Sequence, residues 1–313
     1  MADEHVERVS GMIGVDPTLD ATEGDFLQFL ATECKFHEEE KAVFMRGLDA
    51  FNGLLLVWQF FDSSGAHVDG SAIMVGPGIA ISAYHVLEPH LSDLKDGKKY
   101  SVAIGVAKSG IQIWTVKKAT PLPDLDLVIL GLELSSPLPS DRSFCQAFIT
   151  TRLPKIGECL WVCGFRSEIS EVKPNDGVHE VRAKGNFYVS SGLVTNRYPN
   201  GRDRLMLPWP VLEVDCPSLG GMSGGPVFDR HGYLVGLLCS SFSAEDGRGP
   251  SYVSLLWPAL HMEFEGGWPR SPHFDGALTL AGLANGICDI DNVNVVHAIS
   301  VDGAKKVIYS PWE

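Results

Sequence analysis

The chain has 313 residues and a mass of 34.0 kDa, and 45% of its residues are hydrophobic while 20% are charged. These proportions are typical of a globular protein with a full core, so they exclude a largely disordered chain. Lys and Arg number 25 against 39 Asp and Glu, which gives a formal net charge of −14. An acidic chain without a basic run is a poor candidate for binding nucleic acid or an anionic membrane surface.

The first residues, MADEHVERVSGMIG, contain acids and lack the apolar core of a secretory signal. The most apolar stretch, Phe51 to Phe61, is too short to span a bilayer. We therefore expect a soluble cytoplasmic protein whose seven scattered cysteines are reduced thiols. Cys159 and Cys163 have no second Cys or His pair near them, so no metal site is expected there.

Residues 1–50 differ from the rest of the chain in the spacing of their apolar residues. Asp25 is followed by Phe26, Phe29 and Leu30, and then by the run EEEKAVFMRGL. Apolar positions spaced by three or four residues, with acids near the start, favour one or two short helices. The sequence thus predicts a short helical N-terminal extension over residues 1–50.

Strand-length apolar runs begin at Leu54, with Gly, Pro, Asp and Ser between them, and residues 51–263 form the expected main domain. Examples are LLLVWQFF, SAIMVG, IQIWTVKKA, LVILGLEL, CLWVCGF and YLVGLLCSS. Many short strands with turn signals between them favour an all-β sandwich or barrel. Residues 264–313 are expected to be a small C-terminal appendage that packs on this domain, with a helix starting in 280–283 and a strand over 294–299.

The segment GGMSGGPVF, residues 220–228, is the most informative in the chain. Acyl transfer requires an exposed hydroxyl beside backbone N–H groups that face the developing oxyanion. Glycines around Ser223 permit a tight loop in which the N–H groups of Gly221 and Ser223 converge. We therefore expect Ser223 to be a nucleophile and these two amides to form an oxyanion hole.

A nucleophilic serine needs a base, and the base needs an acid to orient it. Among ten histidines, His85 stands at the end of the apolar run IAISAYHVL. Asp126 opens the apolar run DLVIL, where a buried carboxylate needs a partner such as a histidine N–H. Asp124 is the competing acid, but it follows Pro123 as a turn residue would, so Asp126 is preferred.

The order His85, Asp126, Ser223 resembles that of the trypsin/chymotrypsin-like serine peptidases over roughly residues 52–260. The strings SAYH, DLVIL and GMSGGP are similar to the three motifs that carry the triad in that family. The resemblance implies two antiparallel six-stranded Greek-key β-barrels with the triad between them. It also implies a serine endopeptidase that needs no cofactor or metal and acts on a protein or peptide substrate.

Two departures from the secreted members of the family are informative. Met222 precedes the nucleophile, where those members have an aspartate that pairs with a new N-terminus, and no RIVGG-like cleavage site occurs. The pattern is closer to HtrA-like intracellular bacterial proteases, although about fifty residues after the domain are too few for a PDZ domain. We expect regulation without zymogen cleavage, with a regulatory partner at the N-terminal extension.

The resemblance also places the substrate-binding residues. The base of the primary pocket falls at Pro217, and one wall falls at Cys239, Ser240 and Ser241, with a second wall near residues 251–253. No acid stands at the pocket base, so a small or apolar residue is expected before the cleaved bond, unless Asp215, Glu245 or Asp246 supplies a negative charge from elsewhere.

Three other functions remain open at this point. GMSGG also fits the G-x-S-x-G elbow of α/β-hydrolases, but the strand-turn-strand pattern that follows does not fit the helix which that fold requires. A catalytically latent or inactive protease-fold protein that acts as a binding or regulatory module is the principal alternative. A metal-dependent hydrolase ranks last, because no HExxH or paired-cysteine ligand set occurs.

Overall fold

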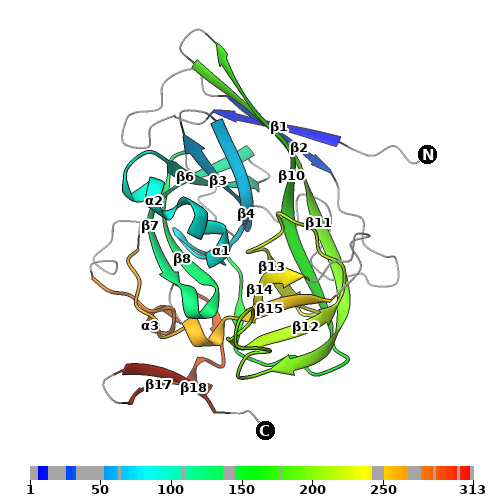
Figure 1. Cartoon of the computed structure of the whole chain (residues 1–313), viewed down its shortest axis with the longest axis vertical. Helices are drawn as coiled ribbons and strands as arrows, with labels where there is room; N and C mark the ends of the chain where they lie inside the picture. Colours follow the sequence, from blue (N-terminus) through cyan, green and yellow to red (C-terminus); the bar gives the residue numbers. More distant parts are fainter. Residues whose placement is uncertain are drawn as a thin grey trace, which may run out of the picture.

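The structure is a computed structural model. It describes residues 6–12, 26–32, 53–62, 65–107, 110–136, 145–175, 178–241, 250–266, 276–284, 287–301 and 304–310. Within these residues the chain is mostly β, with two barrels side by side in Figure 1. The predicted all-β class with two barrels is confirmed.

The first barrel is a closed ring of six antiparallel strands in the order β3-β4-β5-β8-β7-β6. Its strands are β3 (Leu55–Asp62), β4 (Gly65–Gly76), β5 (Ile79–Ala83), β6 (Tyr100–Ala107), β7 (Gly110–Leu122) and β8 (Leu127–Leu134). Successive side chains of β3 enter two different buried clusters, because a strand turns alternate residues to opposite faces. Three short helices follow β5: α1 (Tyr84–Leu87), η2 (Glu88–His90) and α2 (Leu91–Lys95).

The second barrel closes through a ring of antiparallel pairings, β11-β10-β13-β14-β15-β12 and back to β11. Its strands are β10 (Cys159–Asn175), β11 (Val178–Tyr198), β12 (Val211–Asp215), β13 (Pro226–Asp229), β14 (Leu234–Ser241) and β15 (Ser251–Leu255). Strands β10 and β11 are much longer than the others and form a hairpin that extends beyond the ring (Figure 1). Both barrels contribute to one continuous core of buried apolar side chains.

The expected helical N-terminal extension is wrong for the parts that the structure describes. Strand β1 (Val6–Met12) pairs antiparallel with β2 (Phe26–Thr32), and β2 pairs in parallel with β11 at Glu180–Arg182. A short apolar run such as FLQFLAT fits a helix and a strand equally well by spacing, and the long hairpin offers it a free edge. The run EEEKAVFMRGL, also expected to be helical, lies outside the described residues.

The C-terminal segment packs on the barrels, as the sequence predicts. Helix α3 (Leu280–Leu283) and strand β17 (Val296–Val301) occur close to the predicted positions, and β17 pairs with β18 (Ala304–Tyr309). Strand β16 (Ile290–Asp291) pairs with β9 (Ile149–Thr150), and β9 pairs with β14 of the second barrel. The remaining short turns are η3 (Pro123–Leu125), η4 (Trp257–Ala259) and η6 (Val293–Val295).

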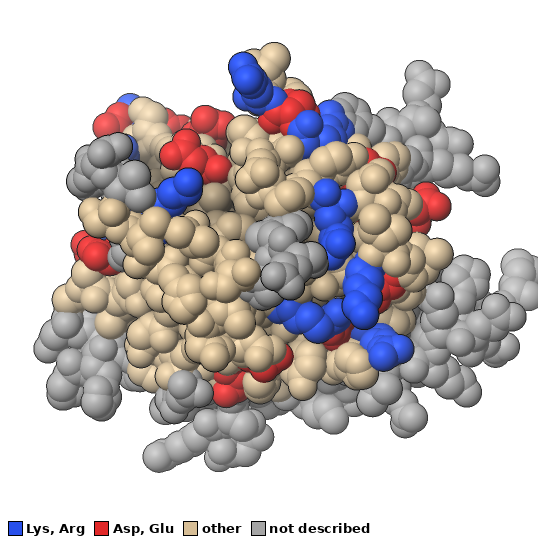
Figure 2. Space-filling view, turned by 90° about the horizontal axis from the view of Figure 1, so that it is seen from below, with Lys and Arg blue, Asp and Glu red and all other residues tan. Residues whose placement is uncertain are grey.

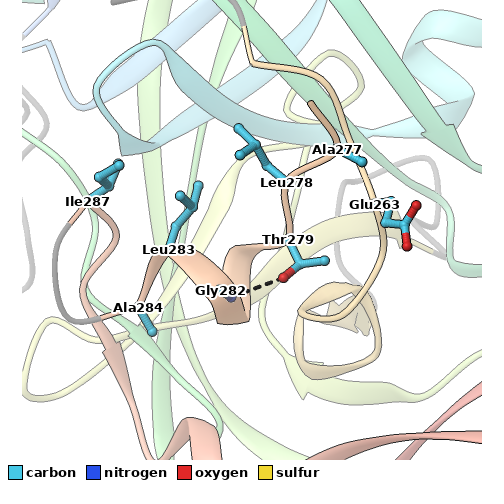
Figure 3. A pocket seen from close by; sticks show the side chains of 8 residues that line it. All are labelled: Glu263, Ala277, Leu278, Thr279, Gly282, Leu283, Ala284 and Ile287. Atoms are coloured by element: carbon cyan, nitrogen blue, oxygen red, sulfur yellow. Dashed lines mark hydrogen bonds between the residues drawn. The ribbon is translucent and has the colours of Figure 1, made fainter. Parts of the chain in front are cut away.

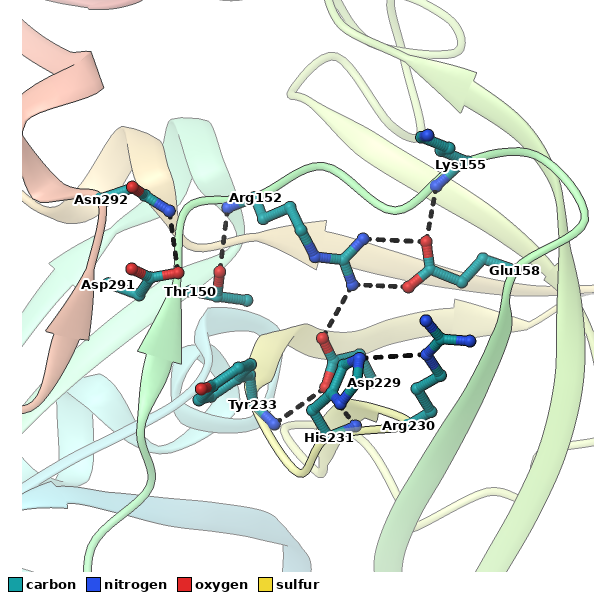
Figure 4. Close-up of polar contacts among 10 residues, drawn as sticks. All are labelled: Thr150, Arg152, Lys155, Glu158, Asp229, Arg230, His231, Tyr233, Asp291 and Asn292. Carbon is teal, nitrogen blue, oxygen red and sulfur yellow. Dashed lines mark hydrogen bonds and ion pairs between the residues drawn. The ribbon is translucent and has the colours of Figure 1, made fainter.

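An ion-pair network fixes the segment that links the two barrels. Arg152 Nη2 lies 2.7 Å from Oδ2 of Asp229, which is fully buried at the end of β13 (Figure 4). The other oxygen of Asp229 accepts the N–H groups of His231 and Tyr233, at 2.8 and 3.0 Å. Arg152 also pairs with Glu158; burial opposes ionisation of this carboxyl, but the hydrogen bonds from Arg152 and from a backbone N–H outweigh it and lower its pKa. A buried carboxylate is stable only with such partners.

The described part of the chain contains no helix long and apolar enough to cross a membrane. On the face that Figure 2 shows, Lys and Arg side chains gather on one side with few acids among them.

Candidate active site

The first barrel brings His85 and Asp126 together through strand register. Ala83, the last residue of β5, pairs with Leu127, the first residue of β8. The residues just outside this pair therefore meet, and Tyr84 N–H donates to the carbonyl oxygen of Asp126 at 3.1 Å. His85 follows at the start of α1, so its ring is held next to the Asp126 side chain.

The Asp126 carboxylate accepts two hydrogen bonds from His85. Its Oδ1 accepts the backbone N–H at 2.9 Å, and its Oδ2 lies 2.8 Å from the ring Nδ1. Asp126 is 5% exposed and has a left-handed backbone with φ of 49°, which aspartate tolerates better than most residues. The competing acid Asp124 is exposed to solvent. With Nδ1 facing the carboxylate, Nε2 is the ring nitrogen left to take a proton from a hydroxyl.

Ser223 lies in the loop between β12 and β13, and backbone hydrogen bonds shape this loop. Gly225 N–H donates to the Met222 carbonyl at 2.9 Å, and Gly224 N–H donates to the Leu238 carbonyl at 2.9 Å. Gly221 and Gly224 have φ of +93° and +76°, which other residues rarely adopt. The N–H groups of Gly221 and Ser223 donate to no other described residue, so both remain available to an oxyanion.

Met222 occupies a buried apolar slot. It is 0% exposed, its sulfur accepts the Leu219 N–H at 3.3 Å, and a Cβ added to Gly164 would approach its Cβ within 2.6 Å. Gly164 belongs to β10, so the nucleophile loop rests directly on the root of the long hairpin. Met222 therefore makes a close apolar contact with Gly164. Because a methionine side chain is uncharged, it cannot form an ion pair at this position.

The structure does not join the three residues in one chain of hydrogen bonds. His85 and Asp126 are in contact, whereas the half-buried hydroxyl of Ser223 makes no hydrogen bond to another described residue. The Ser223 main chain, however, is tied to the first barrel, because its carbonyl accepts the N–H of Ser71 on β4 at 2.8 Å. Catalytic hydrogen bonds in enzymes without a bound ligand are often long and shorten only in the complex.

The expected substrate-binding residues differ in their exposure to solvent. Pro217 is exposed, and the buried residue beside it is Ser218, whose hydroxyl is 2.8 Å from that of Ser251. Cys239 is buried and donates its Sγ–H to a backbone carbonyl, and burial raises the pKa of this thiol to about 12. Ser240 is half-buried, while the side chain of Ser241 lies outside the described residues. Pro217 at the base of the primary pocket therefore stays a prediction.

A cavity of about 710 Å³ opens elsewhere, between α3 and the segment around Leu278 (Figure 3). Its lining includes Thr279, whose hydroxyl caps α3 by accepting the Gly282 N–H, and Glu263. None of the three predicted catalytic residues lines it. Among the described residues, no group of three or more His, Cys, Asp or Glu side chains converges as a metal site requires.

These features together define a two-barrel β protein with a His–Asp pair on one barrel and a glycine-rich serine loop on the other. The family model of the trypsin-like peptidase domain matches residues 70–237. The chain therefore belongs to the trypsin-like peptidases, which confirms the resemblance that its motifs indicate. A comparison with curated proteins gives no match.

Several solved structures are similar to this chain. The active form of the Rv3671c protease from M. tuberculosis is 14% identical, with a TM-score of 0.46 over 79% of this chain and 85% of that one. Deg5 is 17% identical, with a TM-score of 0.45 over 69% of this chain and 90% of that one. The HtrA-type protease AlgW, crystallised with a decapeptide, is 16% identical, with a TM-score of 0.44 over 65% of this chain and 61% of that one.

Proposed function

We propose that this peptidase is a serine endopeptidase whose triad is His85, Asp126 and Ser223. The observation that carries the proposal is the 2.8 Å contact between His85 Nδ1 and the buried Asp126 carboxylate. A carboxylate in this position holds the imidazole in the tautomer that has Nε2 free and stabilises the imidazolium that forms during catalysis.

In the proposed mechanism, Ser223 Oγ attacks the peptide carbonyl while His85 Nε2 takes the hydroxyl proton. The N–H groups of Gly221 and Ser223 stabilise the oxyanion of the tetrahedral intermediate. His85 then gives the proton to the leaving amine, and an acyl-enzyme remains. Water, deprotonated by His85, attacks this ester and releases the second product.

The absence of an acid at Pro217 favours a small or apolar residue before the cleaved bond. The hydroxyls of Ser218 and Ser251 bond to each other, and no acid stands at Pro217 to attract Lys or Arg. We expect wild-type protein to cleave a peptide library mainly after small or apolar residues, with products identified by mass spectrometry. Cleavage chiefly after Lys or Arg would overturn this specificity; a library left intact would contradict the proposed activity itself.

We propose that the protein works in a reducing compartment and that its activity is regulated through the N-terminal extension. Buried cysteines without a disulfide, among them Cys216, Cys239 and Cys288, suit a reducing interior such as the cytoplasm. The extension adds β2 to the edge of β11, at the same hairpin whose root contacts Met222. Such an edge contact is one that a partner strand can compete for.

Deletion of residues 1–50 is expected to change the rate of peptide cleavage at least about threefold, because it uncovers the outer edge of β11, on the hairpin whose root contacts the nucleophile loop. The measurement is kcat/KM on one library-derived peptide, with thermal unfolding as the check on folding. A truncated protein with unchanged unfolding and unchanged kcat/KM would remove the support for regulation through this segment.

A further inference from the structure

A buried serine on β4 joins three parts of the candidate site. Ser71 is 0% exposed, and its backbone N–H donates to the carbonyl of Ser223 at 2.8 Å. Its hydroxyl oxygen accepts the N–H of Phe165 at 2.8 Å, and its own carbonyl accepts the hydroxyl of Ser82 at 2.6 Å. One residue of the first barrel thus contacts the nucleophile loop, the β10 strand and the β5 strand.

These contacts lead to the base, to the nucleophile and to the residue that precedes the nucleophile. Ser82 belongs to β5, the strand that ends immediately before α1 and His85. Phe165 follows Gly164, the residue that rests against Met222 beside the nucleophile. The third contact is to Ser223 itself. Ser71 therefore connects the base, the nucleophile and the apolar support of the nucleophile loop.

The backbones around Ser71 approach one another closely. A Cβ added to Gly224 would come within 2.3 Å of both the Ser71 carbonyl oxygen and the Ser82 hydroxyl. A Cβ added to Gly70 would come within 2.9 Å of the Ser223 carbonyl. Glycine at these positions lets the two backbones approach closely enough for the hydrogen bonds to form.

We propose that Ser71 is a positioning residue, whose hydroxyl and main chain together hold Ser223 in register with His85 across the two barrels. The inference rests on the proposed function, since it concerns the geometry of that same triad. The Ser71 hydroxyl reaches neither His85 nor Asp126, so it acts on the reaction only through where Ser223 lies. A misplacement of about 1 Å in such a site costs roughly 10²-fold in rate.

The test uses the full chain and Ser71→Ala, which removes the acceptor for the Phe165 N–H and leaves both main-chain bonds of Ser71. We expect the rate of labelling by a fluorophosphonate probe and the kcat for a peptide to fall at least about tenfold, with KM changed less than about twofold. The pH dependence of kcat/KM keeps its midpoint, because the His85–Asp126 pair is untouched.

Ser101→Ala is the matched control. Ser101 is also buried in the first barrel, where it accepts from Trp58 Nε1 at 2.6 Å and donates to the Gln59 carbonyl at 3.1 Å. This variant loses as many hydrogen bonds as Ser71→Ala or more, so it reports the effect of lost stability alone, and we expect labelling within about twofold of wild type. Ser82→Ala is the second test variant, and it decides the outcome if Ser71→Ala does not fold.

Labelling rates of Ser71→Ala and Ser82→Ala equal to that of Ser101→Ala would overturn the inference. A wild-type protein that does not react with the probe would instead count against the proposed function. In that event the positioning role is tested by amide hydrogen exchange, compared with the wild-type protein. We expect the Phe165 amide to exchange faster in Ser71→Ala and the Ser71 amide to exchange faster in Ser82→Ala. Unchanged exchange at both amides would refute it.

Discussion

Replacement of Ser223 by alanine is expected to abolish peptide hydrolysis, with kcat lowered by about 10⁶-fold. The variant deletes the attacking oxygen and nothing that the fold uses. The hydroxyl makes no hydrogen bond to another described residue, while the main-chain bond to Ser71 remains. Thermal unfolding should therefore shift by less than about 2 °C. The measurement is single-turnover cleavage of a library-derived peptide, followed by mass spectrometry.

Ser92→Ala provides the control for this variant, because Ser92 is an exposed residue of α2. It should cleave the same peptide at the wild-type rate. A Ser223→Ala protein that keeps a tenth or more of wild-type activity would exclude Ser223 as the nucleophile, since residual catalysis without one is expected to be several orders of magnitude slower.

Asp126→Asn is expected to lower kcat by about 10⁴-fold while the protein stays folded. Asparagine can keep the hydrogen bond from the His85 backbone N–H and accepts the left-handed backbone at this position, φ 49°. Its amide N–H₂, however, faces ring Nδ1 and favours the tautomer that has the proton on Nε2. The ring then cannot take the proton of Ser223. The measurements are kcat for peptide cleavage and the free energy of unfolding.

The adjacent exposed acid makes a direct control, since Asp124→Asn changes the same functional group and should leave kcat unchanged. Asp126→Leu should differ from both in stability, because it removes the acceptor of two hydrogen bonds and costs about 3 kcal/mol of unfolding free energy. Equal activity of Asp126→Asn and Asp124→Asn would show that Asp126 does not orient the base.

Much of the fold could be predicted from the sequence, because strand-length apolar runs separated by Gly, Pro and Asp specify antiparallel strands. The pairing of His85 with Asp126 could also be inferred, since a carboxylate at the start of an apolar strand needs a partner once it is buried. The register of Ala83 with Leu127 shows how the fold provides that partner.

The N-terminal extension could not be predicted in the same way. The run FLQFLAT forms β2 by pairing with β1 and with a distant strand, β11, and local spacing contains no information about these partners. The contacts of Ser71 could not be predicted from the sequence either. Ser71 is an uncharged residue in an apolar strand, and two of its three contacts use backbone atoms, which every residue possesses.

The central claim is that Ser223 is a competent nucleophile oriented by His85 and Asp126. The most direct test is to treat wild-type protein with a fluorophosphonate probe and to map the adduct by peptide mass spectrometry. We predict a single adduct on Ser223, which disappears in the Ser223→Ala variant and forms far more slowly in Asp126→Asn. A folded wild-type protein that gives no adduct, or an adduct on another residue, would contradict the account.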